Sequence, residues 1–161
     1  MKHKMFFLLT LIVFGCQKDN PVTTGQQPLP DFPKVIVTNA NYVESDLQIR
    51  VPDTTYKNKC CTLYKLNLTD SSKRYVANVL LQKAKSLNQD TSIVSECLKA
   101  TGQLKDSLIS VVYFAERAKY QSKECWILEF AWGLSTDDLG HHRCFVIDVV
   151  TKDTLLFITC K

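Results

Sequence analysis

The sequence predicts an α+β domain in which one or two helices pack on an antiparallel β-meander. Two stretches, 73–88 and 92–101, place their apolar residues at helical spacing. Four runs rich in β-branched and aromatic residues follow them, over 108–115, 124–132, 143–150 and 154–160. Helices followed by consecutive strands are typical of a fold with the helices on one face of a sheet.

Three strand candidates precede the helices. The segment 34–39 is a short apolar run, and 46–51 alternates apolar and polar residues as a half-buried strand does. Pro52 ends this second run. The segment 61–68 closes on Leu66 and Leu68, which alternate with polar residues.

Each expected helix has a boundary signal. Asp70, Ser71 and Ser72 offer N-caps before the first helix. Its apolar positions are Val76, Val79, Leu80, Ala84 and Leu87. Gly102 is the expected C-terminal stop of the second helix. Ordinary core packing explains both apolar faces.

The last strands carry the aromatic residues and a hairpin. On 124–132, one face carries Trp126, Leu128, Phe130 and Trp132. We expect this face to be core rather than a sugar- or peptide-binding platform. The strands 143–150 and 154–160 flank a three-residue loop, which is a common hairpin length. That loop would pair Val150 with Thr154.

The N-terminus has three parts, a positive start, an apolar run and a Gly-Cys end. Lys2, His3 and Lys4 precede the ten residues 5–14, which are apolar except for one threonine. A membrane-spanning helix needs about 20 apolar residues, so the run suits a secretory signal rather than a span. Residues 1–15 are therefore expected to be a signal peptide.

Val13, Phe14, Gly15 and Cys16 resemble the lipobox of bacterial lipoproteins. The resemblance implies that Cys16 is acylated, becomes the first mature residue and anchors the protein in the membrane through its acyl chains. Two or more such chains give stable anchoring. Residues 17–20 are similar to the export tag of surface lipoproteins in the Bacteroidota. Together these imply the outer membrane, with the domain facing the surface or the periplasm.

Domain organisation follows from proline content and charge. Residues 16–33 hold the lipidated cysteine and a tether with four of the chain's five prolines, and 34–161 form a single domain. The formal net charge of the chain is +4, and loss of Lys2 and Lys4 leaves +2. Because the remaining charges are scattered, no nucleic-acid partner is expected.

Cysteine usage is typical of an exported domain. Six cysteines remain besides Cys16, and an even number in such a domain predicts disulfides. The spacing matches neither a structural zinc site nor a Cys-x-x-Cys redox pair. The hairpin register places Cys144 opposite Cys160, which makes them the candidate pair. The other cysteines would pair among themselves, namely Cys60, Cys61, Cys97 and Cys125.

The last hairpin resembles PepSY-like exported domains. Asp148, Val149, Val150, Thr151 and Leu155 partly match that family's closing motif, whereas Lys152 stands where the family has Gly. The resemblance covers about forty residues and implies a binding or protease-inhibiting module. A cystatin-like fold, with a helix across an antiparallel sheet, is the competing expectation.

Several other residues are candidate sites. Asp137, Asp138, His141 and His142 share one loop, but adjacent side chains on a strand point to opposite faces, so we expect a solvated loop and no metal. Glu129 and Asp148 are a candidate carboxylate pair on neighbouring strands.

Three segments resemble an O-glycosylation motif of exported bacterial proteins, namely those at Thr54, Ser107 and Thr154. Thr54 is the strongest of the three because Pro52 places it in an expected loop.

The sequence therefore predicts a membrane-anchored envelope lipoprotein with a small non-enzymatic binding or inhibitory domain. Its partner would be a protein, peptide or glycan, and no cofactor is expected. The alternative is an exported hydrolase or thiol enzyme that uses a cysteine or the Asp/His loop. No serine elbow, phosphate-binding glycine loop or metallohydrolase helix is present in the sequence.

Overall fold

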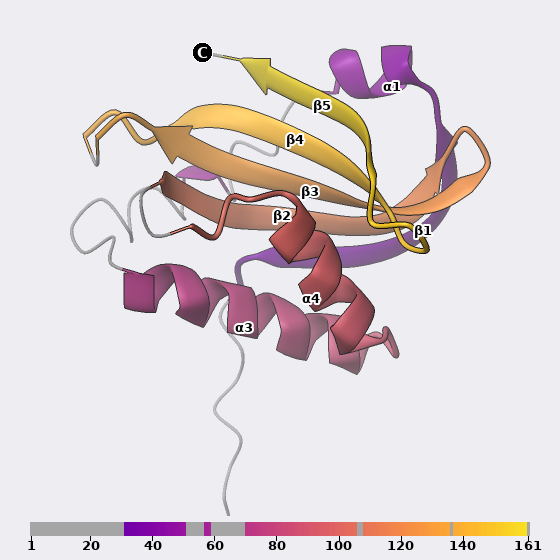
Figure 1. Ribbon diagram of the computed structural model, residues 1–161, viewed down its shortest axis with the longest axis horizontal. Coiled ribbons are helices and arrows are strands. Elements are labelled where there is room, and N and C mark those ends of the chain that lie inside the picture. The colour runs from indigo at the N-terminus through magenta and orange to yellow at the C-terminus, as the bar shows by residue number, and fades with distance from the viewer. Residues whose placement is uncertain (1–30, 51–56, 59–69, 106–107, 136, 161) are drawn as a thin grey trace, which may run out of the picture.

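The computed structural model describes residues 31–50, 57–58, 70–105, 108–135 and 137–160. These residues form three helices and one five-stranded sheet, which confirms the predicted α+β class (Figure 1). The strands are β1 (Lys34–Tyr42), β2 (Ile109–Tyr120), β3 (Lys123–Gly133), β4 (His141–Asp148) and β5 (Thr154–Cys160). The helices are α1 (Glu44–Gln48), α3 (Asp70–Ser86) and α4 (Thr91–Ala100).

The sheet has the strand order β1-β2-β3-β4-β5 and is mixed rather than wholly antiparallel. β2 to β5 form the predicted antiparallel meander. β1 instead runs parallel to β2 and pairs Lys34 with Phe114. Parallel strands need a long crossover connection, and here the chain between β1 and β2 contains α3 and α4.

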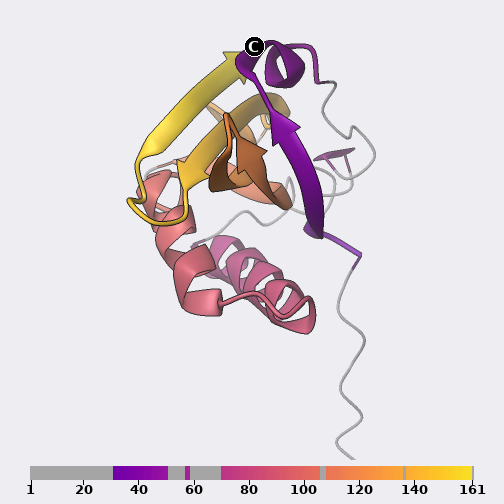
Figure 2. The same ribbon diagram turned by 90° about the vertical axis from the view of Figure 1, so that its right-hand side faces the viewer.

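α3 and α4 cover one face of the sheet, and Figure 2 shows both helices on the same side of the strands. The main core lies between these layers and includes Val76, Leu80, Leu98, Trp126 and Phe130. Trp126 and Phe130 are 1 % and 0 % exposed, so the expectation that they belong to the core is confirmed.

Both expected long helices are present, with the boundary signals of α4 in place. The carboxylate of Asp90 caps α4 by accepting from the Ser92 N–H at 2.8 Å. Gly102 follows the helix with a φ of +67°, which is the left-handed conformation of a C-terminal stop.

A second apolar cluster lies on the opposite sheet face and includes Leu47 of α1 together with Ile127 and Val146. The predicted strand over 46–51 is therefore wrong, since 44–48 are helical. The Asp46 carboxylate accepts from the Val43 N–H at 2.9 Å and closes the first turn. Leu47 is buried, whereas Ile49 is 79 % exposed. The two alternating apolar residues therefore do not lie on one buried face, as they would in a strand. The expected strand at 61–68 lies outside the described residues.

The β4–β5 hairpin differs from its predicted register. β4 ends at Asp148, whose carboxylate accepts from the N–H groups of Val150 and Thr151 at 2.7 and 3.1 Å. The loop is therefore longer than three residues, and Ile147 pairs with Thr154 next to a bulge. Cys144 consequently faces Ile158, and Cys160 faces His142. The register behind the Cys144–Cys160 pairing is wrong, and Cys144 is a free thiol.

The N-terminal segment joins the sheet beside α3. The Lys83 ammonium donates to the Pro33 carbonyl at 3.0 Å, one residue before β1 begins. Residues 1–30, which include Cys16, lie outside the described part of the chain, as do Cys60, Cys61, Thr54 and Ser107. Thr154 is exposed at the start of β5. Within the described residues, every helix is too short or too polar to cross a bilayer.

Candidate functional site

An ionic cluster, defined as Arg50, Glu116 and Glu129, lies on the sheet face opposite α3 and α4, with both carboxylates buried and the arginine partly exposed. Arg50 Nη1 lies 2.7 Å from Glu116 Oε2, and Arg50 Nε lies 3.1 Å from Glu129 Oε1. The two carboxylate side chains are 1 % and 3 % exposed. Burial alone would lower the pKa of Arg50, but the charge of Glu129 and the hydrogen bond to Glu116 outweigh it and raise the pKa. Arg50 is therefore charged and joins two strands at once.

Neighbouring side chains complete the partners of Glu116. Thr38 Oγ1 and Tyr42 Oη, both from β1, donate to Glu116 Oε1 at 2.7 and 3.1 Å. The Arg50 guanidinium lies over the Phe114 ring, with Cζ 4.8 Å from the centroid. Buried charges are tolerated only when paired and hydrogen-bonded, and this carboxylate meets that condition.

A bulge in β2 brings Tyr113 to the cluster. Val112 pairs with Phe130 and Phe114 with Glu129, so Tyr113 is an extra residue on its strand. Bulges commonly re-aim a side chain. The Tyr113 hydroxyl lies 2.7 Å from Glu129 Oε2 and 2.8 Å from His142 Nδ1. The cluster thereby extends to β4.

The hydrogen-bond pattern assigns the tautomer of His142. Tyr113 has one hydroxyl proton and donates it to Glu129, because a carboxylate facing Arg50 accepts only. The Tyr113 oxygen therefore accepts from the Nδ1–H of His142. This arrangement leaves Nε2 of the neutral ring with its lone pair.

Burial makes His142 a poor base. Its pKa is lowered to about 4 by desolvation first and then by the charges of Lys57 and Arg50. Burial and the charge of Glu129 raise the pKa of the Tyr113 hydroxyl far above its ordinary value. Two cations, Arg50 and Lys57, thus accompany the two carboxylates of Glu116 and Glu129. The two neutral groups beside them are the Tyr113 hydroxyl and the His142 ring. This charge balance favours a structural role over proton transfer at neutral pH.

The Asp/His loop is split between two environments. His141 Nε2 lies 3.1 Å from Asp138 Oδ1 at the surface, whereas His142 is buried against Tyr113. The expectation that adjacent histidines point to opposite faces is confirmed. Asp137 is exposed. Among the described residues, no group of three or more His, Cys, Asp or Glu side chains is placed to hold a metal ion.

The expected carboxylate pair of Glu129 and Asp148 does not form. Glu129 faces Cys144 across the sheet, and Asp148 faces Cys125. Glu129 binds Arg50 and Tyr113, whereas Asp148 closes the β4–β5 turn. The side chains serve different structures, so this prediction is wrong.

The described thiols are buried and poorly ionised. Cys97, Cys125 and Cys144 are free, with 0 %, 0 % and 4 % exposure. Desolvation raises the pKa of Cys97 to about 11 and that of Cys125 to about 12, and it raises the pKa of Cys144 as well. Because the thiolate is the nucleophile, these three residues are inert at neutral pH.

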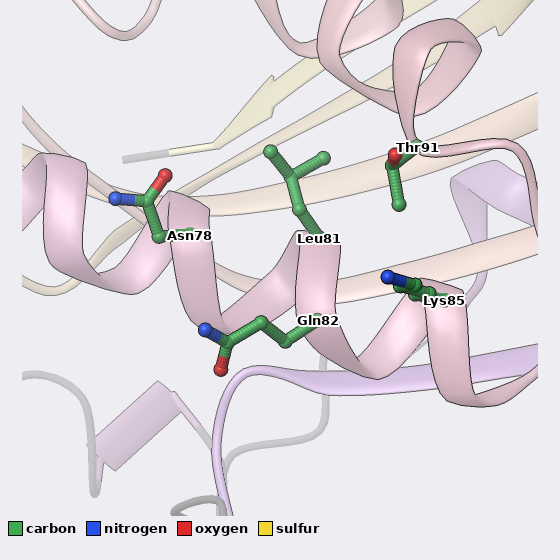
Figure 3. A pocket seen from close by; sticks show the side chains of 5 residues that line it. All are labelled: Asn78, Leu81, Gln82, Lys85 and Thr91. Atoms are coloured by element: carbon green, nitrogen blue, oxygen red, sulfur yellow. The ribbon is translucent and has the colours of Figure 1, made fainter.

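Two hollows outside the ionic cluster are lined by residues that the structure describes. A groove of about 310 Å³ between α3 and α4 is lined by Asn78, Leu81, Gln82, Lys85 and Thr91. In Figure 3, Leu81 points toward α4 while the amide of Gln82 points away from it, so the polar groups do not converge on one ligand.

The second hollow, the Trp132 cleft, has a volume of about 180 Å³ and is lined by Leu108, Ile109, Trp132, Gly133, Leu134 and Arg143. Trp132 shares its strand face with Trp126 and Phe130, but it is partly exposed. The aromatic face is thus core along most of β3 and borders a cleft at the strand's end.

Sequence reasoning missed Arg50, Tyr113 and Glu116. The available signal for Glu116 is its position directly after the apolar run 108–115, and the structure shows that it continues the buried run of β2. Arg50 carries no comparable signal, because it lies at a polar position of the alternating segment 46–51, which is expected to be a strand. The β2 bulge that positions Tyr113 depends on pairing with β3 and leaves no local mark.

Replacing Arg50 with Met should destabilise the fold by about 3 kcal/mol, because it leaves two buried carboxylates without their cation. The free energy of unfolding in urea measures this. Arg117→Met is the matched control, since Arg117 pairs with the half-exposed Glu124 at 2.8 Å and its loss should cost less than about 1 kcal/mol. Equal losses for the two variants would contradict the central role of Arg50.

The lowered pKa of His142 predicts a loss of stability in acid. Between about pH 6.5 and pH 4 the unfolded chain protonates this histidine and the folded chain does not, so the free energy of unfolding falls by roughly 3 kcal/mol as pH drops through that window. His142→Gln should flatten this part of the pH–stability curve. His141→Gln removes an imidazole from the same strand and is the control. Parallel curves for the parent and His142→Gln would rule out this linkage.

Cys97, Cys125 and Cys144 should resist alkylation in the folded protein, since they are buried and protonated. Iodoacetamide at about pH 8 followed by peptide mass mapping should find them modified only after unfolding in urea. Rapid labelling of one of them in the native state would instead identify a reactive thiol.

Comparisons of this chain with protein-family models, with curated proteins and with solved structures found no match. The resemblances to lipoprotein signals and to PepSY-like or cystatin-like domains therefore stay predictions.

Proposed function

We propose that this chain is a lipid-anchored lipoprotein of the bacterial cell envelope, whose α+β domain binds a ligand or partner without catalysing a reaction. The charged start, the ten-residue apolar run and the Gly15-Cys16 end support the anchor. The Pro-rich tether supports a domain held away from the bilayer.

A binding role is supported mainly by one observation. Tyr113, Glu129, His142 and the three described thiols, which could act as a base or nucleophile, are buried and serve the fold instead. Glu129 and Tyr113 bond to each other. His142 bonds to the same tyrosine and is held neutral by burial and by the charges of Lys57 and Arg50. The three described thiols are buried. An enzyme needs a base or nucleophile with a pKa suited to the working pH and access to substrate, and these groups lack both.

The point where the tether joins the domain limits how far the domain can lie from the membrane. The chain enters the sheet at Pro33, where Lys83 of α3 holds the carbonyl. The residues between Cys16 and Pro33 can extend over at most roughly 60 Å. The domain therefore works within that distance of the membrane to which Cys16 would be attached.

Replacing Cys16 with Ser should abolish membrane attachment, because the thiol that would carry the acyl chains is lost. Detergent phase partitioning of the expressed full chain measures this. The parent should enter the detergent phase and Cys16→Ser the aqueous phase.

Cys61→Ser is the matched control, since it also removes one cysteine and leaves Cys16 in place. It should partition as the parent does. If Cys16→Ser still enters the detergent phase, the lipoprotein proposal fails.

A further inference from the structure

The Trp132 cleft combines apolar walls with a single guanidinium. Ile109 begins β2 and Leu108 directly precedes it. Trp132 and Gly133 end β3 and Leu134 directly follows it. Ile109 pairs with Gly133, so the two strand ends adjoin. Arg143 of β4 completes the lining. Leu134 is 85 % exposed, which leaves an apolar side chain in solvent.

Neutral partners hold the Arg143 side chain in place. Its Cζ lies 3.9 Å from the Trp132 ring centroid, and its Nη1 donates to Gln103 Oε1 at 2.9 Å. Gln103 is itself buried and accepts from the buried Ser110 hydroxyl at 3.2 Å. The guanidinium is thus positioned by an aromatic ring and an amide, neither of which neutralises its charge.

The guanidinium retains unused bonding capacity. Arg143 Nε is buried and has no hydrogen-bond partner, and Arg143 forms no ion pair with the residues that the structure describes. A buried donor without an acceptor is unfavourable. Burial also lowers the pKa of Arg143, because the charged form lacks compensation. An anion bound beside the guanidinium in the cleft would compensate its charge.

The size and chemistry of the cleft select the ligand. A carboxylate matches the planar fork of a guanidinium, and an aliphatic or aromatic body matches the apolar walls. An engineered cavity of about 150 Å³ in another protein accommodates benzene. The 180 Å³ of the Trp132 cleft thus suits a body of one ring or one branched side chain.

We propose that the Trp132 cleft binds a small carboxylate with an apolar body, placing the carboxylate on Arg143 and the body against Trp132 and Leu134. The inference rests on the proposed binding function and names its ligand class. A free organic acid and the C-terminus of a peptide with an apolar last residue present this same chemistry.

Titration calorimetry of the full mature protein in detergent micelles tests the proposal. The probes are benzoate, its neutral isostere benzamide, inorganic phosphate, and a short peptide ending in Phe with either a free or an amidated C-terminus. Benzoate should bind saturably at millimolar or lower concentration, and benzamide and phosphate at least about tenfold more weakly. Tighter binding of the free-acid peptide than of benzoate would identify a peptide terminus as the source, and tighter binding of benzoate a free acid.

Variants locate the binding. Arg143→Gln should weaken benzoate binding by about tenfold or more. Arg117→Gln removes a guanidinium that is paired with Glu124 and should leave benzoate affinity unchanged. Leu134→Ser alters an exposed side chain that cannot affect the core and should weaken binding a few-fold, which keeps the test valid if Arg143→Gln misfolds.

Equal affinity for benzoate and benzamide, unchanged affinity in Arg143→Gln, or no saturable heat from any probe up to about 10 mM would overturn the ligand assignment. Those outcomes leave the anchoring result at Cys16 unaffected. Failure of the ligand class is therefore distinguishable from failure of the lipoprotein proposal.

Discussion

Arg50 contacts two buried carboxylates from neighbouring strands, and the packing of one whole sheet face depends on that contact. Without the guanidinium, Glu116 and Glu129 would be two negative charges on the same buried surface. With it, the segment after β1 is held across the sheet, where Leu47 joins Ile127 and Val146 in an apolar cluster. Buried ion pairs contribute little net stability compared with apolar packing, so we attribute to this one the specification of which segment covers the face.

The ionic cluster also explains why Tyr113 and His142 do not transfer protons at neutral pH. Tyr113 and His142 are joined to Glu129 in a chain whose geometry resembles a proton relay. Burial and the nearby cations hold the imidazole neutral, and burial together with the carboxylate holds the phenol protonated. A charge without an ionic partner among the described residues lies instead where the end of β3 meets the start of β4, and there Arg143 rests on Trp132. The polar groups of the ionic cluster and those of the Trp132 cleft thus serve separate purposes in this fold.

Periodicity was sufficient to predict what depends on local pattern and burial. It predicts α3, α4 and the four strands of the meander, because each of these elements places apolar residues in the main core or in the second apolar cluster. It failed where a single side chain redirects the backbone. Asp46 closes a helical turn in a strand-like segment, and Asp148 lengthens the last hairpin. The candidate site was less predictable still, since the Tyr113 bulge and the meeting of Arg50 with Glu116 exist only after distant segments pair.

The parallel pairing of β1 with β2 has a consequence for the order of assembly. Lys34 pairs with Phe114, 80 residues later in the chain. Contacts of such long range form late, because the intervening loop must close before they contribute. A chain that crosses a membrane from its N-terminus would deliver β1 first and its only described neighbour in the sheet much later. In such a chain the first strand to emerge would wait, with its backbone N–H and C=O groups unpaired, until the helices and β2 had followed it.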